Sequence, residues 1–392
     1  MNYLLIIVSL LGIGFHFWPM LFDTAPPALE LSGVEAGKPY RGSITFNIAI
    51  TDESSGVGSL TVQVDADTPQ EMELVSGGRS ATFSLDTAAL SDGAHAISVT
   101  AMDKSWRKNT TQQRLEFDVD NTPPQLQIPL DSLWGGQGKT LGIFVRTDEP
   151  VAEITGKFLD REIAFYPTGD EKQYRGLVGV NVEQPAKNYP LTLKATDLAG
   201  NGVEQSFQVE VGATAFERGG YITLSPEKQQ LMMDKSKGAE DNAKRANAYA
   251  QQESAQLWEG KFIRPTQGAL TSPFGKYREY NTGVRRHHLG TDIANVVGTP
   301  VYAGNNGIVT LAERLYIYGN AVIINHGQGV STSYNHLSEL RVKVGDKVQK
   351  GQLIGLMGAT GQVTGSHLHW GMVVNGVAVA PDEWTEQDFS PP

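Results

Sequence analysis

Six of the eight histidines in this 392-residue chain lie between His287 and His369, and five of these six belong to three short patterned groups. The groups read HHLGTD at residues 287–292, NHLS at residues 335–338 and HLHW at residues 367–370. The chain has no cysteine. A set of imidazoles with one nearby carboxylate and no sulfur is typical of a catalytic zinc site rather than a structural one.

The spacing within two of these groups can bring side chains to one ion. His367 and His369 are two residues apart, so on a strand they project from the same face, while Leu368 packs into the core. A glycine between His288 and Asp292 lets the backbone bend until both side chains reach one metal. Two histidines and one aspartate leave the fourth tetrahedral position for water, which zinc acidifies toward a pKa of about 7.

A zinc hydrolase also needs groups that move protons and stabilise the developing oxyanion. The remaining imidazoles of the three groups, His336 and His367, are the candidates. Tyr334 is either a hydrogen-bond donor to the oxyanion or a buried packing residue. His287 and His326 are interpreted as structural. Because the chain contains no H-E-x-x-H motif, a thermolysin-like glutamate base is not indicated.

Composition and charge restrict the class of protein. The chain is too long for a single core, so two to four domains are expected. Its 40% hydrophobic and 19% charged residues are ordinary for a globular protein. The formal net charge of -11, with no large basic cluster, argues against a nucleic-acid partner.

The amino-terminal residues predict a membrane anchor. Residues 3–22 contain no charged side chain, and a stretch of about 20 apolar residues can cross a hydrocarbon layer as a helix. No Lys or Arg precedes this stretch, and no A-x-A cleavage site follows it. We therefore interpret residues 1–22 as an uncleaved transmembrane helix, with a removed signal peptide as the alternative.

An internal repeat follows the anchor. FDTAPPALEL at residues 22–31 aligns with VDNTPPQLQI at residues 119–128. The repeat length of about 95 residues, with alternating apolar and polar positions, is typical of a small β-sandwich. We predict two immunoglobulin-like domains, at residues 23–121 and 122–213. Acidic residues lie in the turns of both domains, at Asp52, Asp103, Asp148 and Asp197. Such residues either bind calcium or, as is far more common, only stabilise the turn.

The composition changes again after the second repeat. Residues 214–260 are rich in Ala, Gln, Glu, Lys and Met, and we predict a helical linker there. Such a helix can be a connector packed on its neighbours, a partner-binding segment, or a segment that blocks the metal site. From residue 261 to residue 392, short strand-like runs separated by Gly, Asn and Asp predict a β-rich domain.

This β-rich part resembles a known family. The segments that carry the similarity are SPFGKYR, HHLGTDIANVVGTPVYAGNNGIV, GNAVIINHGQGVSTSYNHLS and VKVGDKVQKGQLIGLMGATGQVTGSHLHW. They are similar to the LytM/lysostaphin-type zinc endopeptidases of peptidase family M23. The resemblance implies that His288, Asp292 and His369 bind zinc. It further implies that His336 and His367 are catalytic, orienting or deprotonating water and stabilising the tetrahedral intermediate. Family members cleave peptide cross-links or bridges in peptidoglycan.

The combined prediction is a mainly β protein with two immunoglobulin-like sandwiches, a helical linker and an M23 catalytic domain behind one transmembrane helix. We expect a zinc metalloendopeptidase that hydrolyses peptide cross-links of bacterial peptidoglycan. The alternative is a non-catalytic regulator that binds peptidoglycan or activates cell-wall amidases. The expected location is the bacterial inner membrane, with most of the chain in the periplasm. Expected partners are peptidoglycan stem peptides and proteins of the cell-wall machinery.

Overall fold

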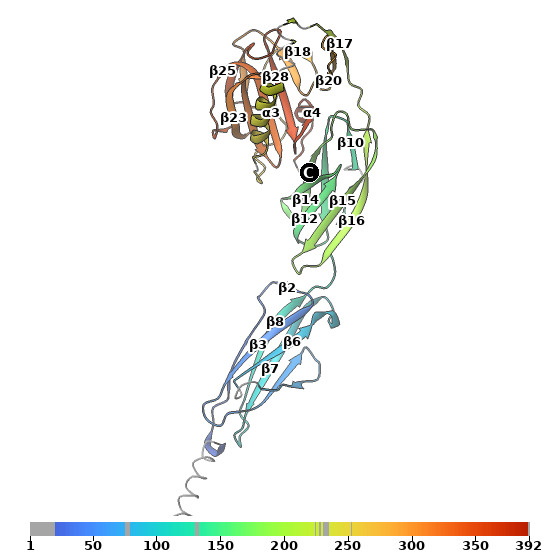
Figure 1. The fold of residues 1–392 in the computed structure, drawn as a ribbon. Coiled ribbons are helices and arrows are strands. Elements are labelled where there is room, and N and C mark those ends of the chain that lie inside the picture. The colour runs from blue at the N-terminus through green and yellow to red at the C-terminus, as the bar shows by residue number, and fades with distance from the viewer. Residues whose placement is uncertain are drawn as a thin grey trace, which may run out of the picture. The chain divides into compact units, whose positions relative to one another are not determined.

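The computed structural model describes residues 20–390, apart from residues 75–78, 130–132, 224, 227–228, 230–234 and 252 (Figure 1). Strands dominate it, which confirms the mainly β prediction. The predicted anchor at residues 1–22 lies almost wholly outside the described residues. Within the described ranges, no helix is both long enough and apolar enough to span a membrane. The chain divides into two compact units, one mainly before residue 125 and one mainly after it.

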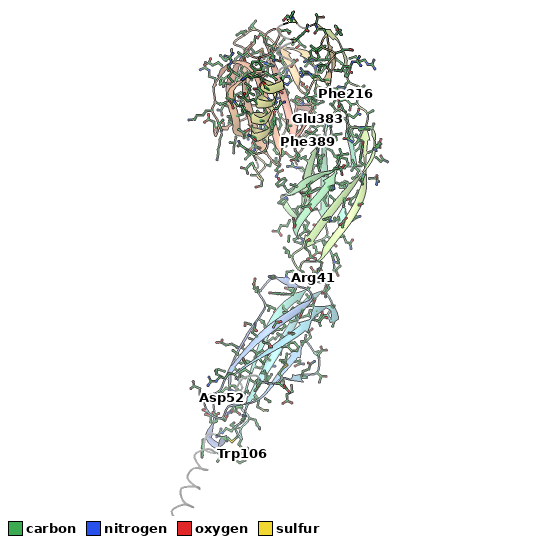
Figure 2. The ribbon with its side chains drawn as sticks, in the orientation of Figure 1. Arg41, Asp52, Trp106, Phe216, Glu383 and Phe389 are labelled. Atoms are coloured by element: carbon green, nitrogen blue, oxygen red, sulfur yellow. The ribbon has the colours of Figure 1, made fainter. Side chains whose placement is uncertain are left out.

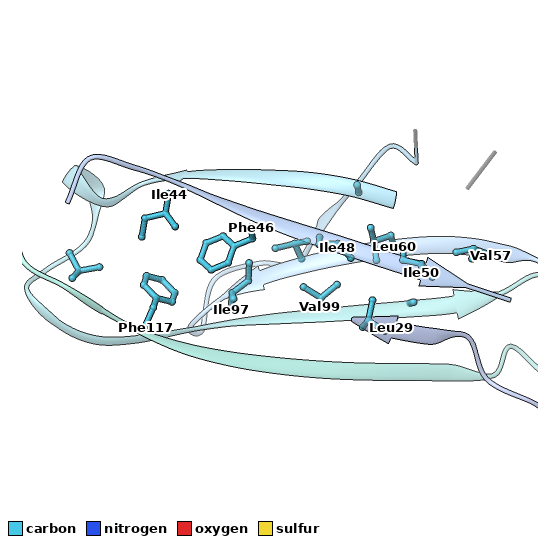
Figure 3. Close-up of a cluster of buried hydrophobic side chains, with 14 residues drawn as sticks. Leu29, Ile44, Phe46, Ile48, Ile50, Val57, Leu60, Ile97, Val99 and Phe117 are labelled. Carbon is cyan, nitrogen blue, oxygen red and sulfur yellow. The ribbon is translucent and has the colours of Figure 1, made fainter. Parts of the chain in front are cut away.

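The first unit contains two sheets that enclose one core. One sheet has the order β1 (Ala28–Ser32), β3 (Ser43–Thr51), β6 (Ser80–Asp86); the other has the order β2 (Pro39–Tyr40), β8 (Thr110–Val119), β7 (Gly93–Asp103), β4 (Val57–Val64), β5 (Gln70–Glu71). A short 3-10 helix, η1, spans Thr87–Ala89. Every second residue of β3 is buried, and its Phe46 packs against Phe117 from the opposite sheet (Figure 3). The immunoglobulin-like assignment itself stays a prediction.

The acidic turns of this unit are held by hydrogen bonds to their own backbone. Asp52 Oδ1 accepts from Gly56 N at 2.7 Å. Asp103 Oδ1 accepts from Ser105 N at 3.1 Å, and its Oδ2 accepts from Asn109 Nδ2 at 2.7 Å. These carboxylates therefore act as turn formers, as that interpretation expects. Calcium binding stays an untested alternative.

The second unit begins with an eight-stranded sheet. Its order is β10 (Trp134–Gly136), β16 (Gly202–Gly212), β15 (Lys187–Asp197), β12 (Val151–Phe158), β13 (Arg161–Thr168), β14 (Asp170–Gly179), β11 (Thr140–Thr147), β9 (Leu126–Gln127). β13 pairs with β12 at its start and with β14 at its end, so the sheet folds over its own core. Ile143, Phe158 and Leu193 are buried there. We call residues 125–212 the second sandwich.

The carboxy-terminal part of the same unit is a ten-stranded sheet. Its main path is β18 (Ala269–Ser272), β21 (Thr291–Ala294), β28 (His367–Val374), β25 (Val330–Leu340), β24 (Gly319–Gly327), β23 (Gly307–Leu315), β26 (Lys347–Val348). The strands β22 (Pro300–Tyr302), β27 (Leu353–Met357) and β29 (Val377–Val379) pair beside this path, and α4 spans Glu383–Glu386. Leu368, Trp370 and Tyr334 belong to the core on one face of the sheet.

The helical prediction for residues 214–260 is only partly right. Helix α3 (Lys235–Tyr249) lies there, and its Ala248 packs in a cluster with Leu311 and Ala321. However, residues 218–222 form a strand, β17 (Arg218–Ile222), which pairs with β19 (Tyr277–Tyr280); β19 pairs in turn with β20 (Arg285–His287). The linker is therefore docked on the carboxy-terminal domain, because its backbone donors and acceptors pair with a strand of that domain.

The second sandwich and the carboxy-terminal sheet share a buried interface. Thr140 N donates to Glu383 Oε2 at 2.8 Å, and Trp384 Nε1 donates to Thr140 Oγ1 at 2.8 Å. Leu177 of the sandwich joins a cluster that also contains Trp384 and Phe389. Arg175, fully buried, donates to the carbonyl of Phe389 (Figure 2 labels Glu383 and Phe389). These contacts fix the sandwich against the sheet.

This interface gives a prediction about pH and stability. Burial raises the pKa of Glu383 to about 7. The native state therefore keeps a proton that the unfolded chain has released, so stability decreases as pH rises from about 4.5 through about 7. Glutamine keeps the acceptor for Thr140 N but does not titrate. Relative to the wild type, we expect Glu383→Gln to raise the free energy of unfolding at pH 8 by up to about 3 kcal/mol.

Urea denaturation followed by tryptophan fluorescence at pH 5 and pH 8 measures this effect. The two proteins should have nearly equal free energies of unfolding at pH 5, where Glu383 is protonated in the native state. A difference of the same size at both pH values would contradict the assignment of the effect to this carboxyl.

Candidate metal centre

The three predicted ligands meet at one point. β21 and β28 are antiparallel, and their register places Asp292 directly opposite His369. His288, which follows β20, completes a triangle of ligand atoms. His288 Nε2 lies 3.0 Å from Asp292 Oδ1 and 2.9 Å from His369 Nδ1, and His369 Nδ1 lies 2.9 Å from Asp292 Oδ1.

This triangle fits a zinc ion. Zinc lies about 2.0–2.1 Å from its nitrogen and oxygen ligands, so an ion at this distance from all three atoms would lie roughly 1 Å above their plane. All three residues line a cavity of about 860 Å³, which leaves an open side for water or substrate. Two imidazoles and one carboxylate are also the donor set of catalytic zinc. The residues present therefore fit the ion, while their role as ligands stays a prediction.

Local sequence explains the close approach. His367 and His369 share one face of β28, and Leu368 is fully buried between them, which confirms the predicted alternation. A Cβ atom at Gly290 would lie only 2.6 Å from the imidazole of His369. Glycine is therefore required for the segment that carries His288 to pass this close to β28.

Second contacts orient two of the ligands. His288 Nδ1 lies 3.2 Å from the carbonyl oxygen of Pro273, so its N–H donates there and leaves the Nε2 lone pair facing the triangle. Arg278 Nη2 lies 2.7 Å from Asp292 Oδ2 and donates to Ser272 Oγ at 2.6 Å. Asp292 Oδ1 is thus left for the ion.

Arg278 escaped the sequence interpretation, although it ends the SPFGKYR segment. Because partners that orient a ligand typically contribute 10- to 100-fold to metal affinity, we expect Arg278→Ala to lower zinc affinity by about that factor. Arg278→Lys should recover part of the loss. Competition with a chromophoric chelator measures the affinity. The matched control is Arg285→Ala, since Arg285 forms an ion pair with the exposed hairpin residue Glu279 and lies outside the ligand triangle; an equal loss in both variants would contradict the orienting role.

The two predicted catalytic histidines lie beside the triangle. Their rings are 5.0 Å apart, and the ring of His336 is 6.1 Å from that of His369. His336 Nδ1 lies 2.9 Å from Thr360 O, and His367 Nδ1 lies 2.9 Å from Gly365 O. Each Nδ1–H therefore donates to a carbonyl, which leaves each Nε2 as a free proton acceptor. Burial, with repulsion from neighbouring histidines, lowers the pKa of His336 to about 3, so its ring is neutral at pH 7.

A bulge in β25 aims His336 at the site. Residues 322 and 320 of β24 pair with Tyr334 and Leu337, so β25 contains one extra residue at this point. Tyr334 and Leu337 both pack in the core, and His336 has a φ of 66°. The bulge turns the His336 side chain to the face of the sheet that carries Asn335 and His369. With unbroken alternation, His336 would instead lie on the opposite face, buried beside Tyr334.

The structure also decides the open alternatives for other residues. Tyr334 is fully buried, and its hydroxyl accepts from Gly304 N at 2.8 Å, so the packing interpretation is right and the oxyanion role is wrong. His326 is fully buried, with Nδ1 2.6 Å from Asn306 O, and is structural as predicted. His287 likewise donates to a backbone carbonyl and makes edge-to-face contacts with the rings of Phe216 and Tyr277.

Helix α3 contributes a residue that sequence interpretation missed. Arg245 lies 3.9 Å above the ring of Tyr318, and its Nη1 donates to Asn335 Oδ1 at 3.0 Å. Asn335 Nδ2 in turn donates to the backbone carbonyl of His369 at 3.1 Å. The helix therefore supports the strand that carries a ligand. Arg245 and Tyr249 of α3 also line the cavity that contains the three predicted ligands. Whether this segment blocks the metal site stays a prediction.

Comparison with known proteins identifies this domain. Residues 286–381 match the sequence model of peptidase family M23. The chain contains a peptidase family M23 domain. Within this domain lie all five predicted site residues, whereas Arg278 and α3 lie before it. The family match therefore covers the candidate ligands but not all of the groups that orient them.

The M23 domain also resembles named proteins. It is 49% identical over 89 residues to the peptidoglycan DD-endopeptidase ShyA of Vibrio cholerae, covering 23% of this chain and 21% of that protein. The chain is 43% identical over 112 residues to the DD-carboxypeptidase/endopeptidase Mpg of Neisseria meningitidis, covering 29% of this chain and 26% of that protein. The chain thus matches only about a quarter of the length of these curated relatives.

Solved structures include a similar domain. The catalytic domain of lysostaphin from Staphylococcus simulans is 28% identical, with a TM-score of 0.25. The match covers 34% of this chain and 100% of that domain. Lysostaphin is described as an antimicrobial peptidase.

Proposed function

We propose that the protein is a zinc metalloendopeptidase that hydrolyses peptide cross-links of bacterial peptidoglycan. The observation that carries the proposal is the triangle formed by His288, Asp292 and His369, with edges of 2.9–3.0 Å. The M23 domain supports a peptidase, and the names of the relatives support peptidoglycan as the substrate. The complete set of five site residues argues against a non-catalytic regulator.

The proposed mechanism divides the work between the ion and the histidines. His288 Nε2, Asp292 Oδ1 and His369 Nδ1 would hold zinc, which supplies a Lewis acid that lowers the pKa of water and polarises the scissile carbonyl. His336 Nε2, neutral and unprotonated, takes the proton of the attacking water as general base. The imidazolium that results then donates this proton to the leaving amine. His367 Nε2 lies 3.8 Å from Asp292 Oδ1 and lines the same cavity, where it can orient the water.

Digestion of purified sacculi tests the proposal. The protein without residues 1–22, incubated with sacculi, should release fragments whose masses show hydrolysis of a peptide cross-link. Addition of a chelator should stop the release, and addition of zinc should restore it. Intact cross-links after incubation with the zinc-loaded protein would contradict the proposal. Cleavage of a glycan bond would show that the protein is a glycosidase and not a peptidase.

We further propose that residues 1–22 anchor the protein in the bacterial inner membrane, with most of the chain in the periplasm. Support comes from the uncharged run at residues 3–22 and from the location of the proposed substrate outside that membrane. Fractionation and protease accessibility in spheroplasts test it. Protein protected from external protease would contradict this orientation.

A further inference from the structure

The cavity at the metal centre is basic, although the chain as a whole is acidic. The formal net charge of the chain is -11. Yet Asp292 is the only carboxylate among the described residues that line the cavity. The cationic side chains that line it are Arg161, Arg245, Lys276, Arg278 and Arg286. Such a concentration of one sign of charge in a cleft attracts ligands of the opposite sign.

Three of these cations have no acidic partner among the described residues, but one of them, Arg245, is engaged by hydrogen bonds with Asn335 and Tyr249. Arg278 is paired with Asp292, and Lys276 Nζ lies 3.2 Å from Glu217 Oε2. Among the described residues, Arg161 and Arg286 form no ion pair. Arg286 lies over the ring of Tyr280, at 5.2 Å. Two guanidinium groups at the cavity are therefore available to a ligand.

Arg161 reaches the cavity from the second sandwich. It begins β13, immediately after a tight turn in which Leu159 and Asp160 have φ of 51° and 58°. Asn181 and Val182 of the same sandwich also line the cavity. The buried contacts of Thr140 with Glu383 and Trp384 hold the sandwich against the carboxy-terminal part of the same unit. The wall of the cavity thus includes residues outside the peptidase domain.

We propose that this cavity selects peptides with free carboxylates beside the scissile bond, and that Arg161 and Arg286 determine this specificity. A guanidinium group binds a carboxylate through two parallel hydrogen bonds and keeps its charge at every physiological pH. This inference rests on the proposed peptidase function and specifies its substrate. It also gives the second sandwich a part in substrate binding.

The test uses two synthetic cross-linked stem peptides, identical except that the carboxyl groups beside the scissile bond are acids in one and carboxamides in the other. For the full chain and the acid peptide, we expect Arg161→Ala and Arg286→Ala each to raise KM about 3- to 5-fold, the range of an exposed ion pair, with kcat unchanged. The carboxamide peptide should start with a raised KM that neither variant changes further. Controls are Arg146→Ala on the second sandwich and Arg314→Ala on the M23 domain, both exposed and outside the cavity.

The outcomes separate this inference from the proposed function. Equal KM for the two peptides, or an equal effect of the variants on both, would overturn the carboxylate specificity while leaving the peptidase function intact. Should the wild type cleave neither peptide, the proposed function fails. Binding of the acid peptide to the full chain by calorimetry, with the variants as above, then tests the cavity alone. Binding weakened about 3- to 5-fold only in the cavity variants would support it, and unchanged binding would refute it.

Discussion

Alanine in place of His369 is expected to abolish metal binding and peptide hydrolysis together. His369 supplies one of the three proposed ligand atoms, and its Nδ1 lies 2.9 Å from both of the others. The two atoms that remain cannot complete a tetrahedral site. Because a zinc ion contributes several kcal/mol to transition-state stabilisation, we expect kcat/KM to fall by about 1000-fold or more.

Elemental analysis for zinc and cleavage of sacculi measure the two losses in the same preparation. Circular dichroism shows whether the variant is folded. The control is His95→Ala in the first unit, where the histidine pairs with Asp65 and should leave both zinc content and activity unchanged. A His369→Ala protein that keeps its zinc and its activity would refute the assigned ligand set. A folded variant that loses zinc but still activates an amidase would favour the regulator instead.

The sequence was sufficient for those parts of the site that depend on short spacing. His367 and His369 are on one face of β28 because alternation along a strand is a property of the backbone. The glycine between His288 and Asp292 marked the bend correctly, since any side chain there would collide with His369. The mainly β composition followed from the same alternation.

The parts that failed depend on which distant segments pair. The contact of Arg278 with Asp292 requires β18, β19 and β21 to come together, and the local spacing of residues does not predict this contact. Residues 218–222 form a strand because they pair with the edge of β19, although the composition of residues 214–260 predicts a helical linker. The bulge that turns His336 toward the metal site is likewise a property of the pairing of two strands.

These non-local contacts change how the catalytic unit is defined. The residues that match family M23 begin at residue 286, yet Arg278 and Arg245 lie before them and support Asp292 and Asn335. The second sandwich adds Arg161 to the cavity wall. A fragment containing only the matched residues would lose all three contacts. We therefore regard the whole second unit as the part of the chain to be assayed for activity.

Replacement of His336 should remove catalysis while leaving the metal site loaded. Its Nδ1–H is held by Thr360 O, and its Nε2 is the free acceptor beside the triangle. A positioned general base typically contributes 10²- to 10⁴-fold, so we expect kcat to fall by about that factor with little change in KM. Zinc content should stay at the wild-type level, because His336 is not one of the three ligands.

The backbone at residue 336 dictates which substitution is informative. Its φ of 66° is strained for alanine, whereas asparagine adopts this left-handed conformation more readily. His336→Asn therefore keeps the bulge and removes the base, while His336→Ala combines both effects. If the loss comes from missing proton transfer, both variants should lose kcat equally, although only His336→Ala should also unfold at a lower temperature. Recovery of kcat to within about tenfold of wild type in His336→Asn would show that the residue only shapes the strand.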